Sequence, residues 1–175
     1  MSLFQHVLDD VSLSQKSNLG DTLKQLFKSK PYSLAVIETV TGGAVSSYLS
    51  HLHLPTFIGG TVCHHPRSLA LFGASSDMIQ SPELHQTDLV KALLKGANSH
   101  YAADVSVATV GILSAEVPDQ NIVSRITLGF AIKEKVIIKT LELSGTIRLI
   151  IENSTLAALT YLKQYLINER SEKTQ

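Results

Sequence analysis

Residues 32–49 read Tyr-Ser-Leu-Ala-Val-Ile-Glu-Thr-Val-Thr-Gly-Gly-Ala-Val-Ser-Ser-Tyr-Leu and decide the fold. The apolar run at 34–37 is too short for a buried helix, contains β-branched side chains and leads to two glycines, which predicts an inner strand. After the glycines, apolar residues recur at the three- and four-residue intervals of a helix face, at Val45, Tyr48, Leu49 and Leu52. The stretch therefore predicts a strand, a glycine turn and a helix.

The turn between this strand and helix is the candidate site. Glycine has no Cβ, so backbone can approach a ligand there, and the first N–H groups of a helix lack partners within the helix. Thr39 or Thr41 would supply a hydroxyl for nucleophilic attack. Gly42 or Gly43 would supply N–H groups for the charge that develops on a substrate oxygen. The same Thr-Gly-Gly sequence is more commonly a helix N-cap with a flexible turn, and both interpretations stay open.

Glu38 is the last residue of the apolar strand, where a carboxylate is costly unless it is paired or exposed. Three roles stay open for it. It is a functional carboxylate, a cap for the N-terminus of the following helix, or the partner of Arg67.

Composition limits the classes of partner. The chain has 175 residues, 44% of them hydrophobic, enough for one sizeable core. Lys plus Arg and Asp plus Glu number 15 each, so charge favours neither nucleic acid nor an anionic membrane. The lone Cys63 fits a reducing compartment, the first ten residues lack a basic leader region, and no apolar run approaches the roughly 18 residues of a membrane span. We expect a cytoplasmic protein.

The rest of the chain alternates between helical and strand patterns. Gly20-Asp21 predicts the N-cap of a helix that stops before Pro31, and apolar spacing predicts a further short helix near the N-terminus, at Leu3, Phe4, Val7, Leu8 and Val11. Strands are expected at 57–63, 105–110, 125–132 and 136–143, the last two as a hairpin, and helices at 68–72, 81–101 and 147–166. About five strands then form a mixed α/β sheet with helices on both faces.

Three loops would form the rim of a site in such a sheet. Ligands of open α/β sheets bind beyond the carboxyl ends of the strands. If the strands that precede them are parallel, the loops at 38–43, 63–67 and 111–121 converge there.

Histidines near these loops raise the question of a metal or a base. The chain has His51 and His53, and then Cys63, His64 and His65. Their spacing matches no paired zinc pattern, and adjacent strand residues point to opposite faces, so we expect no metal. His64 or His65 is a candidate general base, because imidazole titrates near neutral pH, although histidines at a strand end more often lie on the surface.

One motif resembles a known family. Residues 37–43, Ile-Glu-Thr-Val-Thr-Gly-Gly, are similar to the Ala-Glu-Ser-Cys-Thr-Gly-Gly signature of the CinA C-terminal domain family, whose active members are nicotinamide mononucleotide amidohydrolases. Further similar stretches follow in the family's order at 57–62, 91–96, 103–112 and 157–159.

The resemblance covers residues 20–168, which divides the chain into an N-terminal extension at 1–19, this domain, and a tail at 169–175. It implies a three-layer α/β/α fold, often paired as a homodimer. We expect no cofactor, and we expect a nucleotide-like small molecule as the ligand, with Glu38, Thr41, Gly42, Gly43 and Arg67 as its binding residues.

The departures from the family pattern bear on chemistry. Thr39 stands where active members have the serine nucleophile, Cys63 or His64 where they have a tyrosine, and Arg67 or Ser68 where they have a lysine. The glycine-rich Gly-Ile-Ala-Gly-Pro loop is replaced by residues 111–118. A threonine's methyl crowds a pocket and restricts χ1, and arginine stays protonated and cannot act as a base.

Two functions therefore stay open, and whether the chain is an enzyme depends on which holds. In the first, the domain has lost the family's Ser/Tyr/Lys machinery and serves as a binding or interaction protein. In the second, it hydrolyses nicotinamide mononucleotide or a related amide, with Thr39 as nucleophile and His64 as substitute base. Because catalytic groups that act as a unit fail as a unit, the replacements favour the first.

Overall fold

The computed structural model describes residues 13–115, 117 and 119–172. The strand, turn and helix predicted for residues 32–49 are confirmed. A short helix at 76–80 is the one element of this part of the chain that the sequence patterns do not predict. The elements in chain order are α2 (Leu13–Ser29), β1 (Leu34–Glu38), α3 (Ala44–His51), β2 (Phe57–Val62), α4 (Pro66–Leu71), α5 (Ser76–Gln80), α6 (Pro82–Tyr101), β3 (Val105–Gly111), β4 (Ile122–Ile132), β5 (Lys135–Gly145) and α7 (Ile147–Glu172).

The strands form one mixed sheet of five, as predicted, in the order β2-β1-β3-β4-β5. β1 runs parallel to both of its neighbours, and Glu38 at its end lies level with Val62 of β2 and Thr109 of β3. β3, β4 and β5 pair antiparallel, and β4 and β5 form the predicted hairpin. The carboxyl ends of β1, β2 and β3 therefore meet at one edge of the sheet.

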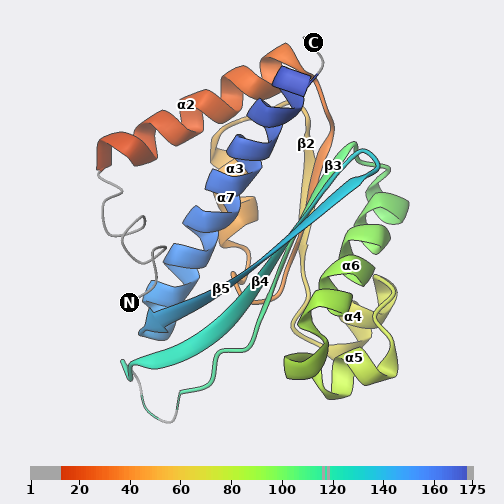
Figure 1. Ribbon diagram of the computed structural model, residues 1–175, viewed down its shortest axis with the longest axis vertical. Coiled ribbons are helices and arrows are strands. Elements are labelled where there is room, and N and C mark those ends of the chain that lie inside the picture. The colour runs from red at the N-terminus through yellow and green to blue at the C-terminus, as the bar shows by residue number, and fades with distance from the viewer. Residues whose placement is uncertain (1–12, 116, 118, 173–175) are drawn as a thin grey trace.

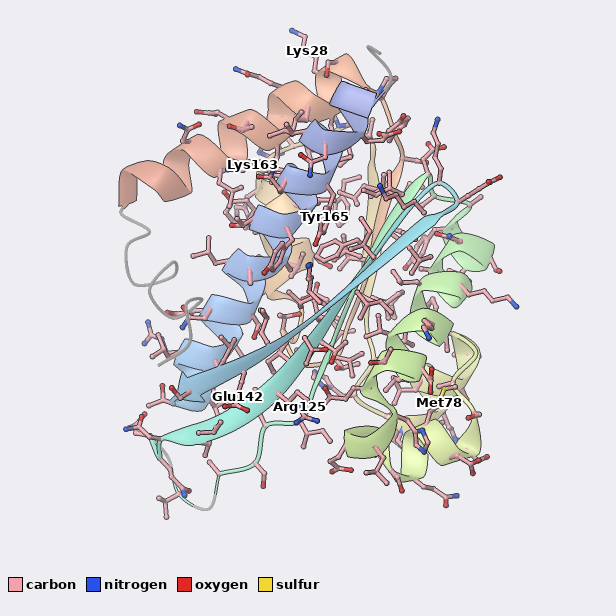
Figure 2. All side chains as sticks on the ribbon, in the orientation of Figure 1. Lys28, Met78, Arg125, Glu142, Lys163 and Tyr165 are labelled. Atoms are coloured by element: carbon pink, nitrogen blue, oxygen red, sulfur yellow. The ribbon has the colours of Figure 1, made fainter. Side chains whose placement is uncertain are left out.

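Helices cover both faces of the sheet, which makes a three-layer α/β/α fold. α2, α3 and α7 lie on one face and α4, α5 and α6 on the other (Figure 1). Each face has its own buried cluster, exemplified by Leu23, Leu49 and Phe130 on the first and by Leu89 and Leu93 on the second. On the first face Tyr165 points from α7 toward the sheet (Figure 2), where its ring meets that of Phe130 edge to face with centroids 5.2 Å apart.

Gly20 lies inside a helix, so its prediction as part of an N-cap is wrong. α2 runs through it from Leu13 to Ser29. A Cβ at Gly20 would stand 2.9 Å from Leu52 Cδ2 and 3.2 Å from Tyr48 Oη. The missing side chain therefore lets α2 pass close to the end of α3, a tertiary contact that the local sequence pattern does not reveal.

Helices cross both domain boundaries expected from the sequence. α2 spans residues 19 and 20, and α7 spans 168 and 169 and ends at Glu172. The division into 1–19, 20–168 and 169–175 thus follows no element boundary, and it stays a prediction. The helix predicted from Leu3 to Val11 lies outside the described residues. Among the helices that the structure describes, none combines the length and the apolar character that crossing a bilayer requires.

A reciprocal pair of side chains joins the amino ends of β1 and β3. Asp104 Oδ2 accepts hydrogen bonds from Ser33 N (2.9 Å) and Ser33 Oγ (2.8 Å), and Asp104 N donates to Ser33 Oγ (2.9 Å). The two hydrogen bonds that the carboxylate accepts lower the pKa of Asp104. The bond from the Ser33 hydroxyl has the larger effect and the bond from the Ser33 N–H the smaller. The pair fixes the start of both parallel strands.

Asp104→Asn is expected to reduce stability at neutral pH by less than about 1 kcal/mol, because this carboxylate is exposed to solvent. The pKa of Asp104 is lowered in the folded state, so its contribution is complete above the unfolded value of about 4 and is lost as pH falls through the folded value. Urea denaturation at a series of pH values should show the two proteins converging below about pH 4. A difference that grows on acidification would contradict this assignment.

Candidate functional site

An open cavity of about 630 Å³ lies at the carboxyl ends of β1, β2 and β3. The three loops expected to converge do so, since residues of each loop line it. The wall is completed by α4, the α5–α6 segment and one residue of α7. The lining residues are Thr39, Val40, Gly42, Cys63, His64, Pro66, Leu69, Ile79, Pro82, Leu89, Val110, Gly111, Ile112, Leu113 and Ile151.

Glu38 caps α3 from the end of β1, which is one of the three roles left open for it. Its side chain is fully buried. Oε2 accepts from Thr41 Oγ1 (2.6 Å), Gly43 N (3.0 Å) and Val45 N (3.1 Å). Oε1 accepts from the N–H (2.8 Å) and the hydroxyl (2.5 Å) of Ser46. Five donors surround this carboxylate, and the negative charge lies at the positive end of the α3 dipole.

The turn that brings the carboxylate to the helix needs both of its glycines. Gly42 and Gly43 have φ values of 60° and 100°, a region that other residues enter only with strain. This left-handed turn aims the Gly43 N–H at Glu38 rather than into the cavity. Gly43 therefore does not offer its N–H to a substrate oxygen, whereas Gly42 lines the cavity.

Thr41 and Arg67 lie outside the cavity lining. Thr41 is 2% exposed, and its hydroxyl lies between Glu38 Oε2 and Thr109 Oγ1, 2.7 Å from the latter. Arg67 is exposed on α4. Within the described residues, the five groups that donate hydrogen bonds to the Glu38 carboxylate all come from residues 41–46, so Arg67 is not its partner.

Thr39 lines the cavity with its hydroxyl held by backbone. Thr109 O accepts from both Thr39 N (2.9 Å) and Thr39 Oγ1 (3.0 Å). A backbone carbonyl cannot take up the proton that a nucleophilic hydroxyl must lose. Within the described residues no hydrogen bond joins Thr39 to a histidine, and in this structure the hydroxyl is held by the Thr109 carbonyl.

The two candidate bases differ in position. His64 is exposed and lines the cavity. His65 caps α4 instead, since its Nδ1 accepts from Arg67 N at 3.1 Å. Of the two histidines, only His64 lines the cavity that Thr39 also lines.

Cys63 is the buried thiol of this wall, with 1% of its surface exposed. Burial raises its pKa, and a hydrogen bond with Ser68 opposes part of that rise. Because the thiolate is the nucleophilic form, this cysteine is a poor nucleophile near neutral pH. In the described part of the chain no three His, Cys, Asp or Glu side chains gather as metal ligands do.

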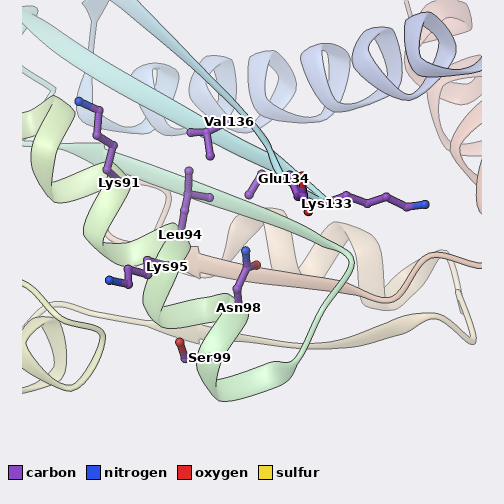
Figure 3. Close-up of a pocket in the computed structure, with 9 residues that line it drawn as sticks. Lys91, Leu94, Lys95, Asn98, Ser99, Lys133, Glu134 and Val136 are labelled. Atoms are coloured by element: carbon purple, nitrogen blue, oxygen red, sulfur yellow. The ribbon is translucent and has the colours of Figure 1, made fainter. Parts of the chain in front are cut away.

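Cationic side chains gather at a different place. A second cavity of about 450 Å³ lies between α6 and the β4–β5 hairpin and includes Lys91, Lys95 and Lys133 (Figure 3). The three side chains extend in different directions there. Lys91 Nζ is 3.5 Å from Asp88, and Lys133 Nζ lies over the Tyr32 ring, 4.8 Å from its centroid. The three ammonium groups therefore do not form a common binding site for an anion.

The sequence alone does not predict that several residues belong to the site. Thr109 reaches it only through the pairing of β1 with β3, and Ile151 only through the packing of α7. Ser46 carried a local signal, because it lies in the first turn of the helix that follows Glu38. The unpredicted α5 also carried one, since Ser75 is its N-cap and accepts from Met78 N at 3.5 Å.

Comparisons with known proteins agree with this architecture. The family model of the CinA C-terminal domain matches residues 16–166. A relative from Geobacter sulfurreducens named CinA-like protein is 23% identical over 172 residues, which is 95% of this chain and 42% of that protein. The chain thus spans less than half the length of that relative.

Solved structures show the same fold. The competence damage-inducible protein A from Klebsiella pneumoniae aligns with a TM-score of 0.74 at 15% identity, over 86% of this chain and 96% of that one. A CinA superfamily protein from Enterobacter cloacae aligns with a TM-score of 0.72 at 18% identity, over 85% and 90%. With the family model matching most of its length, the chain belongs to the CinA C-terminal domain family.

Proposed function

We propose that this CinA C-terminal domain binds a small molecule in the cavity at the strand ends and does not hydrolyse it. The main support is the hydrogen bonding of Thr39, whose hydroxyl proton goes to the Thr109 carbonyl rather than to a base. The neutral thiol of Cys63 and the engaged N–H of Gly43 support the same conclusion. The cavity keeps the size and location of a ligand site.

A second candidate is amide hydrolysis of nicotinamide mononucleotide or a related compound. The observation in its favour is that Thr39, Gly42 and His64 line one cavity. In that reaction the Thr39 hydroxyl would attack the amide carbonyl, with its proton passing to His64 and on to the departing ammonia. Water would then hydrolyse the resulting Thr39 ester, which releases the acid and restores the hydroxyl. The mechanism requires Thr39 Oγ1 to leave the Thr109 carbonyl before it reaches His64.

An ammonia-release assay separates the two candidates. Purified protein incubated with nicotinamide mononucleotide is expected to release no ammonia above the level of its Thr39→Ala variant. Thr39→Ser, which restores the family's signature residue, is expected to stay equally inactive because a hydroxyl without a base gains little from losing a methyl group. Release that Thr39→Ala abolishes would establish the hydrolase.

Ligand binding by the protein can be tested without measuring activity. Thermal unfolding is measured with nicotinamide mononucleotide and with a panel of uncharged ring amides, because a ligand that binds only the folded state raises the midpoint. A rise with at least one of these compounds is expected. Ammonia release that persists in Thr39→Ala would show hydrolysis by another nucleophile and would also overturn the proposal.

A further inference from the structure

The strand-end cavity has a mainly apolar wall. Its apolar side chains come from both faces of the sheet, with Leu69, Ile79 and Leu89 on one side and Leu113 and Ile151 on the other. The lining also contains the hydroxyl of Thr39 and the imidazole of His64. Among the described residues that line it, none is a lysine, an arginine or a carboxylate.

The nearest helix N-terminus already holds an anion. Phosphate recognition in α/β folds commonly uses the first N–H groups of the helix that follows a strand. Here the N–H groups of Gly43, Val45 and Ser46 all donate to Glu38. These three N–H groups are therefore not available as donors to a ligand phosphate at this turn.

Thr39 determines whether a ligand group next to it must donate or accept a hydrogen bond. Because its proton is donated to Thr109 O, the hydroxyl oxygen offers lone pairs toward the cavity. A ligand group next to Thr39 therefore gains by donating a hydrogen bond. Amide and amine N–H groups meet this requirement, while a carboxylate or phosphate oxygen does not.

From these three observations we infer that the cavity selects an uncharged, largely apolar ring compound whose N–H group donates to Thr39 Oγ1, and rejects phosphorylated nucleotides. This inference rests on the proposed binding function and specifies its ligand class. The apolar wall supplies most of the affinity, and Thr39 supplies the orientation.

Three matched probes test it. 1-Naphthamide is uncharged and has an N–H donor, methyl 1-naphthoate is uncharged without a donor, and 1-naphthoate is anionic. Backbone amide NMR titrations of the whole chain are expected to show the amide binding at least tenfold more tightly than the anion, with the ester between them. Shifts are expected at residues of the cavity wall.

Leu69→Lys places a cation in the wall and is expected to reduce the preference for the amide over the anion by at least tenfold. Leu71→Lys is the matched control, because it lies on the same helix with 84% of its surface exposed and outside this cavity. It should keep the preference of the parent protein.

Thr39→Val removes the lone pair at nearly constant shape and provides a second test if Leu69→Lys unfolds. The amide is expected to fall to the affinity of the ester, which stays unchanged. Equal or tighter binding of 1-naphthoate by the parent protein, no binding of any probe, or tighter binding of nicotinamide mononucleotide than of 1-naphthamide would each overturn the inference. Nucleotide binding without ammonia release would leave the proposed function standing, so the two failures are distinguishable.

Discussion

Glu38→Ala is expected to lower the free energy of unfolding by about 3–5 kcal/mol, the largest effect of a single substitution at this site. The fully buried carboxylate receives five hydrogen bonds, three from backbone N–H groups at the start of α3 and two from hydroxyls. Removing it leaves those N–H groups, which are buried or partly buried, without an acceptor and removes a charge that favours the helix N-terminus. Urea denaturation followed by circular dichroism measures the loss.

Two variants show whether the loss comes from the cap. Glu38→Gln keeps one carbonyl oxygen but turns an NH₂ group toward donors, so a smaller loss of about 2–3 kcal/mol is expected. Glu134→Gln, at an exposed position in the β4–β5 turn, should change stability by less than about 0.5 kcal/mol. A loss below about 1 kcal/mol in Glu38→Ala would refute the capping role.

Gly96→Ala is expected to destabilise the fold by about 2–3 kcal/mol, although alanine is the better helix former. Gly96 lies within α6 where the chain around Phe72 crosses it. A Cβ there would stand 2.3 Å from the Phe72 carbonyl oxygen and 2.7 Å from its carbonyl carbon. Because these are backbone atoms, the clash can be relieved only by moving the Phe72 segment away from α6.

The control for Gly96 lies one residue earlier. Lys95→Ala changes an exposed position of the same helix and should stay within about 0.5 kcal/mol of the parent protein. Thermal unfolding of the two variants side by side measures the difference. A neutral or stabilising effect of Gly96→Ala would show that the backbone at Phe72 does not pack tightly against α6.

The part of the fold that local pattern controls was predictable. The short apolar run of β1 and the helical spacing of α3 are properties of neighbouring residues, and so is the polar turn between β4 and β5. The mixed sheet followed from helical and strand patterns that alternate and then end in a hairpin. Gly20 and α5 were missed, because a glycine is tolerated in a helix that packs closely and because a five-residue helix has too few positions to show a period.

The site was predictable only in outline. The three loops could be assigned to one edge because parallel strands share their carboxyl ends. The role of Glu38 could not be chosen among its three alternatives, since the choice depends on a turn with two positive φ angles that directs the carboxylate back to α3. The hydrogen bond from Thr39 to the Thr109 carbonyl depends on the register between β1 and β3. The two residues are 70 positions apart in the sequence, so no local pattern encodes this contact.

The capping of α3 by Glu38 sets a trade-off for redesign of this domain. Opening the turn to a phosphate means removing the very side chain whose loss should weaken the fold most. A variant engineered for nucleotides would need compensating stabilisation elsewhere before that exchange, for example at the α2–α3 contact. Among substitutions at the strand ends, those that reshape the apolar wall are therefore the accessible route to new ligands.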